Sequence, residues 1–154
     1  MWLPNGWDER GAMGTELFSD AWAAGWAKEI NGSDAFRVAA LKWESGFVLV
    51  MDGDPAIGLA EPRAVFVQLS GGECRAGRAA TEVDLASAPY ILRASPAVWR
   101  QVLGGDLEPV GAVMTGLMDL SRGNLVSLAP WLGAAKELVR AACRVECAFP
   151  EGMD

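Results

Sequence analysis

The fold is decided by the stretch Tyr90–Trp131, YILRASPAVWRQVLGGDLEPVGAVMTGLMDLSRGNLVSLAPW. Its hydrophobic pattern predicts a strand, two short helices with one apolar face each, a polar strand and the start of a last helix. The stretch holds more apolar side chains than a small domain needs to close its core, and almost none that are suited to catalysis. It therefore favours enclosing an apolar ligand over breaking a bond.

The bulk composition predicts one globular domain. The chain has 154 residues, of which 51% are apolar and 21% are charged, values typical of a folded protein with a real core. Its formal net charge of −7 argues against a nucleic-acid partner, because phosphate binding needs clustered Lys and Arg. No apolar run approaches eighteen residues, so we expect no stable membrane insertion.

The chain has no histidine, which removes the commonest general base and every Ser-His or Cys-His nucleophile pair. An enzyme would have to use carboxylates, such as Asp84 with Asp119 or Glu108, but their spacing is not diagnostic and solvated surface acids are the simpler interpretation. We therefore expect a protein that is not an enzyme and that has no catalytic residues.

Neither the cysteines nor the acidic residues predict a metal centre. Cys74, Cys143 and Cys147 contain no CxxC pair and are interpreted as small, buried apolar residues in a reducing compartment. The segment Asp52–Pro55, DGDP, lacks the further spaced oxygens of a calcium loop, so it predicts a turn. We expect no metal and no cofactor.

Residues 1–13 show no hydrophobic period and predict an irregular N-terminal extension, followed by a single domain over residues 14–147 and a short acidic tail over 148–154. The first ten residues, MWLPNGWDER, lack the basic and apolar regions of a secretory signal, so we expect a cytoplasmic protein.

An amphipathic helix is predicted from Thr15, over TELFSDAWAAGWAKEI, with Trp22 and Trp26 on its apolar stripe, and a shorter helix follows over AFRVAALKW. Core packing is the simplest role for these two indoles. Together with Trp2 and Trp7 they also motivate an alternative function, an accessory or dimerisation module acting through protein contacts, because aromatic residues are enriched in interfaces. A homodimer or a partner enzyme is therefore a second hypothesis.

The middle of the chain predicts strands. Residues 47–51 and 64–69 are apolar runs with strand character, and Gly71-Gly72 predicts a tight hairpin loop that leads into a partner strand over 73–77. Val83 and Leu85 predict the start of a further strand, and residues 90–93 predict another. We expect these strands to be antiparallel.

Helix signals return in the last third of the chain. Ser95-Pro96 and Pro109 each begin a helix, a polar edge strand is predicted over 118–122, and one continuous helix is predicted from Leu125 to Ala142. The fold class is therefore α+β, with one mostly antiparallel sheet and helices laid over a single face.

Residues 34–143 resemble the sterol carrier protein 2 family of lipid-binding domains. The resemblance is carried by motifs in a fixed order: Gly46–Val50, Val65–Gly72, Ile91–Ala94, Trp99 with Val102–Gly105, Glu108-Pro109, Ala112 with Met114–Gly116, and Gly123–Leu125. It implies a five-stranded, mostly antiparallel sheet covered by helices, with an apolar tunnel between the sheet and the helices. Family members bind sterols, fatty acids or fatty acyl-CoA.

The resemblance and the apolar helix faces together predict a ligand site. We expect non-catalytic binding and carriage of a lipid or another hydrophobic small molecule, with Met114 and Met118 adapting their flexible side chains to an acyl chain. Arg93, Arg100 and Arg122 are candidates for contact with a head group. The predicted apolar lining consists of Phe47, Phe66, Met114, Leu117, Met118, Leu125, Leu128, Trp131 and Leu132.

Overall fold

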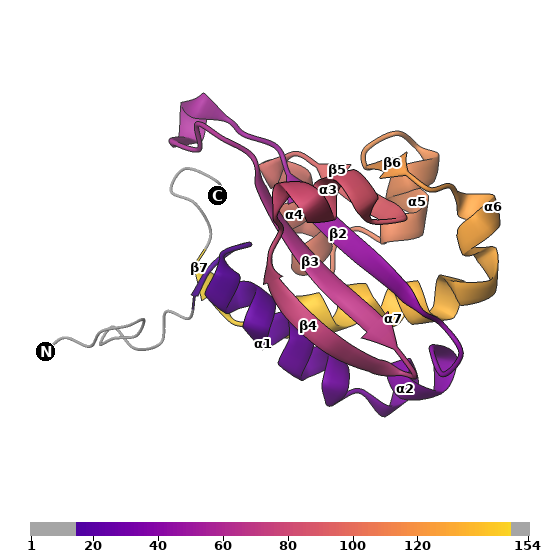
Figure 1. Cartoon of the computed structure of the whole chain (residues 1–154). Coiled ribbons are helices and arrows are strands. Elements are labelled where there is room, and N and C mark those ends of the chain that lie inside the picture. Colours follow the sequence, from indigo (N-terminus) through magenta and orange to yellow (C-terminus); the bar gives the residue numbers. More distant parts are fainter. Residues whose placement is uncertain (1–14, 149–154) are drawn as a thin grey trace, which may run out of the picture.

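The computed structural model describes residues 15–148 and shows a twisted five-stranded sheet with helices packed against it (Figure 1). The strand order across the sheet is β4-β3-β2-β5-β6. In chain order the strands are β2 (Ser45–Met51), β3 (Arg63–Ser70), β4 (Glu73–Ala79), β5 (Tyr90–Ala94) and β6 (Asp119–Arg122). The predicted α+β class and its five-stranded sheet are therefore confirmed.

The sheet is mostly antiparallel, as expected, but its centre is not. Strands β2 and β3, β3 and β4, and β5 and β6 pair antiparallel, whereas β2 and β5 run parallel with Phe47 opposite Tyr90. A parallel pair needs a long crossover connection. Here the β3–β4 hairpin and the segment after it fill that connection, and the hairpin turns through Gly71 and Gly72, both with positive φ.

Alternate residues of the central strand β2 face two different clusters. Phe47, Leu49 and Met51 belong to the main core, whereas Val48 and Val50 belong to a smaller cluster on the other face. The helices whose buried residues belong to the main core are α1 (Asp20–Asn31), α2 (Asp34–Ala39), α4 (Pro96–Leu103), α5 (Pro109–Met114), α6 (Leu125–Leu128) and α7 (Leu132–Cys143).

The segment with Val83 and Leu85 is a helix, α3 (Glu82–Ser87), so the prediction of a strand there was wrong. The side chain of Thr81 accepts a hydrogen bond from the Asp84 N–H, and the Asp84 carboxylate accepts one from the Thr81 N–H. This reciprocal cap satisfies two backbone donors that a helix start leaves free. Leu85 packs on the smaller cluster, which places α3 on the face of the sheet opposite to α7 (Figure 1).

The first helix begins later than Thr15. Ser19 caps α1 by accepting a hydrogen bond from the Trp22 N–H, and β1 (Thr15–Glu16) pairs in parallel with β7 (Cys147–Ala148). The predicted start at Thr15 was therefore wrong: Ser19 is the residue that caps the helix, and a two-residue strand whose partner lies at the other end of the chain leaves no local pattern.

The predicted continuous last helix is divided. It consists of α6, the 3₁₀ turn η3 (Ala129–Trp131) and α7. Pro130 lies in η3, and proline removes a backbone donor and clashes with the preceding turn of an α-helix. The spacing of Leu125, Leu128 and Leu132 by three and four residues suggested one helix, because side chains three residues apart share a face in a 3₁₀ turn as well.

Among the contacts that hold α1 against the rest of the fold, those of Trp26 and of Gly77 join it to two different elements. The indole Nε1 of Trp26 donates to the Leu138 carbonyl at 2.9 Å, which joins α1 to α7. On the other side, Gly77 lets α1 lie directly on β4, since a Cβ at this position would come within 2.7 Å of the Ala23 carbonyl oxygen and of the Ala27 Cβ. Trp22 and Trp26 are both fully buried.

The segment Asp52–Pro55 forms the turn that was predicted. The Asp54 carboxylate accepts a hydrogen bond from the Ala56 N–H and caps the 3₁₀ turn η2 (Pro55–Ile57). No helix within residues 15–148 is long and apolar enough to cross a lipid bilayer.

Candidate functional site

An apolar cavity lies between the sheet and the helices α5, α6 and α7. It has a volume of about 40 Å³ and almost no polar surface. The strands contribute Phe47 from β2, Leu92 from β5 and Leu120 from β6, while the helices close the cavity from the other side. We refer to this space as the apolar cavity.

Four of the nine predicted lining residues border the apolar cavity: Phe47, Leu125, Leu128 and Leu132. The structure therefore brings the strand β2 and the α6–α7 region to one small space, while the tunnel itself stays a prediction.

The other five predicted residues do not border the apolar cavity. Met118 is buried in the main core, and Trp131 packs against that core from η3. Met114 and Leu117 are instead 73% and 50% exposed, because α5 ends at Met114 and turns its last residues toward solvent. Phe66 lies on the opposite face of the sheet, since it pairs with Val48 and shares its orientation.

Sequence reasoning missed seven residues of the cavity wall: Leu92, Pro109, Val110, Leu120, Ala135, Lys136 and Val139. For some of them a signal was available. Leu92 and Leu120 are apolar residues of the two stretches predicted as strands, and Ala135 and Val139 continue the apolar stripe of α7. Lys136 carried no such signal, because a lysine beside an apolar stripe is typical of any helix at a surface.

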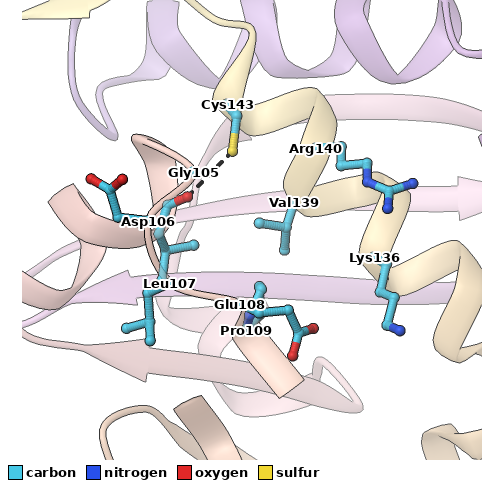
Figure 2. A pocket seen from close by; sticks show the side chains of 10 residues that line it. Gly105, Asp106, Leu107, Glu108, Pro109, Lys136, Val139, Arg140 and Cys143 are labelled. Carbon is cyan, nitrogen blue, oxygen red and sulfur yellow. Dashed lines mark hydrogen bonds between the residues drawn. The ribbon is translucent and has the colours of Figure 1, made fainter. Parts of the chain in front are cut away.

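A second, wider cleft adjoins the apolar cavity. It has a volume of about 370 Å³ and lies between α7 and the loop that joins α4 to α5 (Figure 2). Pro109, Lys136 and Val139 line both spaces. The lining of this cleft is mixed, and we call it the polar cleft only because charged side chains lie on its walls. The rest of it is lined by Val102, Gly105, Asp106, Leu107, Glu108, Arg140 and Cys143.

The charged groups of the polar cleft come from opposite walls. Figure 2 shows Lys136 and Arg140 projecting from α7, with Asp106 and Glu108 on the facing loop. Both carboxylate oxygens of Glu108 accept hydrogen bonds from the first turn of α5, from the Gly111 N–H at 2.8 Å and the Val110 N–H at 3.1 Å. The Arg140 guanidinium pairs with Glu137. Within residues 15–148 the Lys136 ammonium has no ion pair or hydrogen bond of its own.

The two cysteines whose burial the structure describes differ. Cys74 is buried, as expected, and burial raises the pKa of its thiol to about 11. Cys143 is exposed at the edge of the polar cleft, so the prediction of burial was wrong for this residue. Its thiol donates to the Val102 carbonyl at 3.4 Å, and partial desolvation raises its pKa, which disfavours the reactive thiolate.

The three arginines predicted to contact a head group lie elsewhere. Arg93 pairs with Asp52, and Arg122 donates to the carbonyl groups of Leu85 and Ala88. None of Arg93, Arg100 and Arg122 lines the apolar cavity or the polar cleft.

The structure does not bring the candidate catalytic carboxylates together. Asp84 lines a separate cleft of about 320 Å³ on the other face of the sheet, where Phe66 also lies. Burial would raise the pKa of Asp84, but hydrogen bonds from Thr81 and Arg78 outweigh it and lower that pKa. Glu108 caps α5 beside the polar cleft, and Asp119 is exposed on β6.

Solved structures similar to this chain identify its family. A crystal structure of sterol carrier protein 2 superposes with a TM-score of 0.77 at 40% sequence identity, and the match covers 84% of this chain and 99% of that one. The chain belongs to the sterol carrier protein 2 family. A solution structure of a conserved hypothetical protein from Thermus thermophilus is also similar, with a TM-score of 0.76 at 39% identity over 88% of this chain and 94% of that one.

More distant members of the sterol carrier protein 2 family share the fold alone. The apo form of sterol carrier protein 2 from Yarrowia lipolytica has a TM-score of 0.56 at 13% identity, over 86% of this chain and 98% of that one. No family model matches the sequence, and no curated protein matches it either.

Within this sterol carrier protein 2 domain, Trp22 and Trp26 cannot form an interface, because both side chains are fully buried in the core of their own chain. Trp2 and Trp7 lie outside the described residues. The hypothesis of a homodimer or a partner enzyme therefore stays a prediction, and Trp22 and Trp26 are not candidates for its interface.

Proposed function

We propose that the protein binds and carries a hydrophobic small molecule with an acyl chain or a similar apolar body, without transforming it chemically. The observation that carries this proposal is the apolar cavity beneath α6, with the polar cleft adjoining it at Pro109, Lys136 and Val139. Membership of a family whose solved members are named sterol carriers supports the same function.

Apolar walls provide the driving force for such binding. Burial of apolar surface contributes about 25 cal/mol per Å², so a ligand chain enclosed by leucine and valine side chains gains several kcal/mol. The walls here come from six separate elements, β2, β5, β6, α5, α6 and α7, so that the sheet contributes Phe47 and the helical layer contributes Leu132 to the same space.

The apolar cavity must widen to hold such a chain. Ligand pockets commonly have volumes of about 300–1,000 Å³, well above the roughly 40 Å³ of this cavity. The four-residue helix α6 supplies Leu125 and Leu128 to the wall, and η3 with Pro130 separates it from α7. A small outward shift of α6 would therefore enlarge the cavity while the sheet and α7 keep their places.

The direct test is extraction of freshly purified protein with organic solvent, followed by mass spectrometry, together with titration of fluorescent fatty-acid and sterol probes. We expect a stoichiometric apolar molecule in the extract or saturable uptake of at least one probe. A protein that is empty and takes up neither probe would refute the proposed function.

A pair of substitutions locates the binding site. Ala135→Leu fills the apolar cavity from α7 and should weaken probe binding about tenfold or more, because the added methyl groups occupy the space of the ligand. Ala24→Leu makes the same change at an exposed position of α1 and should leave the affinity unchanged. Equal affinities of the two variants, with unfolding midpoints showing both folded, would place the ligand elsewhere.

A further inference from the structure

The apolar cavity meets a cleft with charged groups on its walls at Lys136. This residue lines the apolar cavity together with Leu132 and Val139, and it also lines the polar cleft together with Arg140. The four-carbon stem of a lysine packs well against apolar surface while its ammonium reaches a wetter region. Lys136 is thus placed where the apolar part of a bound amphiphile ends and its polar part begins.

We propose that Lys136 binds the anionic head group of the carried molecule, with the head group in the polar cleft and the chain in the apolar cavity. This inference rests on the proposed function. The ligand class is then a single-chain amphiphile that ends in a carboxylate or a phosphate, in preference to an uncharged alcohol or sterol.

The neighbouring charges leave Lys136 as the group that is available for a ligand. Both oxygens of Glu108 are held by backbone N–H groups of α5, and Arg140 is paired with Glu137. Asp106 projects from the wall of the cleft that faces α7 (Figure 2). The Lys136 ammonium has no such partner within the described part of the chain, so an anion beside it gains an ion pair without breaking an existing one.

The net charge of the protein makes a preference for an anionic ligand depend on a local contact. The net charge of −7 repels anions at long range, and salt screens that repulsion beyond roughly 10 Å. Attraction of an anionic head group must therefore come from a local contact. We expect the preference for the anion to disappear when the Lys136 ammonium is removed.

The volume of the polar cleft bears on the size of the head group. At about 370 Å³ it is much larger than the apolar cavity, so it can admit a phosphate as well as a carboxylate. The two head groups share their anionic chemistry, and the experiment has to separate them.

The experiment compares three ligands of equal chain length, a saturated fatty acid, its alkyl phosphate and its fatty alcohol, by calorimetric titration at pH 8. The wild-type protein should bind at least one of the two anions about tenfold more tightly than the alcohol. Whichever anion is preferred identifies the head group.

Three variants assign that preference to a residue. Lys136→Met keeps an unbranched stem without the charge and should bind the preferred anion as weakly as the alcohol, while Lys136→Arg should restore the preference. Lys28→Met, at an exposed position of α1, is the matched control and should behave as wild type.

The outcomes separate the two proposals. If all three ligands bind equally, or if Lys136→Met weakens the anion and the alcohol alike, Lys136 does not select the head group, whereas the proposed carriage of apolar molecules stands. If none of the three ligands binds to the wild-type protein, this inference fails, and the proposed function fails with it only if the protein also yields no apolar molecule on extraction and takes up no sterol probe.

Discussion

Trp43 and Trp131 stack face to face, with ring centroids 6.0 Å apart and an interplanar angle of 12°. Trp43 is buried and also meets Phe47, which lines the apolar cavity, edge to face. Trp131 ends the η3 turn between α6 and α7. Through Trp43, the stack therefore connects η3, which lies between the cavity-lining helices α6 and α7, to Phe47 of strand β2.

Removal of this stack should loosen the cover of the apolar cavity. We expect Trp131→Ala to lower the free energy of unfolding by about 1–3 kcal/mol, since a half-buried indole loses its packing and its aromatic partner. Release of a bound probe, measured by stopped-flow fluorescence, should also become faster. Val126→Ala, at an exposed position on the neighbouring α6, serves as the control and should change neither quantity.

Two buried indoles of α1 should respond differently to the same substitution. Trp26 donates its Nε1–H to the Leu138 carbonyl, whereas the Nε1–H of Trp22 is buried and has no partner among the described residues. Trp26→Phe should therefore cost about 1 kcal/mol more stability than Trp22→Phe, because only Trp26 loses a hydrogen bond. Urea denaturation of both variants measures the difference. Equal losses would show that the bond to Leu138 contributes nothing.

The contact between α1 and β4 depends on the missing side chain of Gly77. Gly77→Ala should destabilise the protein by about 1–3 kcal/mol, because the new methyl group meets the backbone of Ala23 and the side chain of Ala27. Gly133→Ala is the matched control in α7, where nothing lies within 4 Å of the added Cβ. It should stabilise the helix by about 0.5–1 kcal/mol. Thermal unfolding checks both signs, and a neutral Gly77→Ala would mean that α1 can shift away from β4.

Asp84 should make stability depend on pH in the acid range. Its carboxylate accepts hydrogen bonds from Thr81 and Arg78, and its pKa in the folded protein is lowered. The unfolded chain, with an aspartate pKa of about 3.9, then binds the proton more readily, so the stabilisation is complete above that pH and disappears as the pH falls through the lower folded pKa.

The comparison of wild type with Asp84→Asn measures this contribution. We expect the wild type to be more stable by about 1–2 kcal/mol at pH 7, a modest value because the Arg78 side chain is partly exposed. The difference should shrink below a pH of about 4. Asp119→Asn, at an exposed carboxylate, should show no such trend, and a pH-independent difference for Asp84→Asn would exclude this linkage.

Much of the fold could be predicted because its signals are local. The cap at Ser95, the glycines of the β3–β4 hairpin and the apolar run of β2 all mark their elements within a few residues. The errors arose where two local signals competed. Val83 and Leu85 alternate as in a strand, yet Thr81 and Asp84 cap the same segment as a helix, and the cap decides because it satisfies backbone donors directly.

The wall of the apolar cavity could be predicted only in part, and its role as the ligand site stays a prediction. Leu125, Leu128 and Leu132 were recognisable from their helical spacing, and Phe47 from its strand. Phe66 was assigned to the wrong face, although the alternation of side chains along β3 puts it on the face opposite to Val65, Val67 and Leu69, which point into the main core.

By itself, the sequence determined the α+β class, the order of most elements, the absence of histidine and the resemblance to sterol carrier protein 2, since each depends on residue types and spacings along the chain. Only the tertiary structure decided which side chains meet. It placed Met114 and Leu117 at the surface, and Phe66 in the smaller cluster on the opposite face of the sheet. It also placed Lys136 at the junction of the apolar cavity and the polar cleft. The physical reason is that a cavity forms between elements that are distant in sequence. The pairing of the strands and the break at Pro130 determine which faces of the sheet and of the helices α6 and α7 lie against each other.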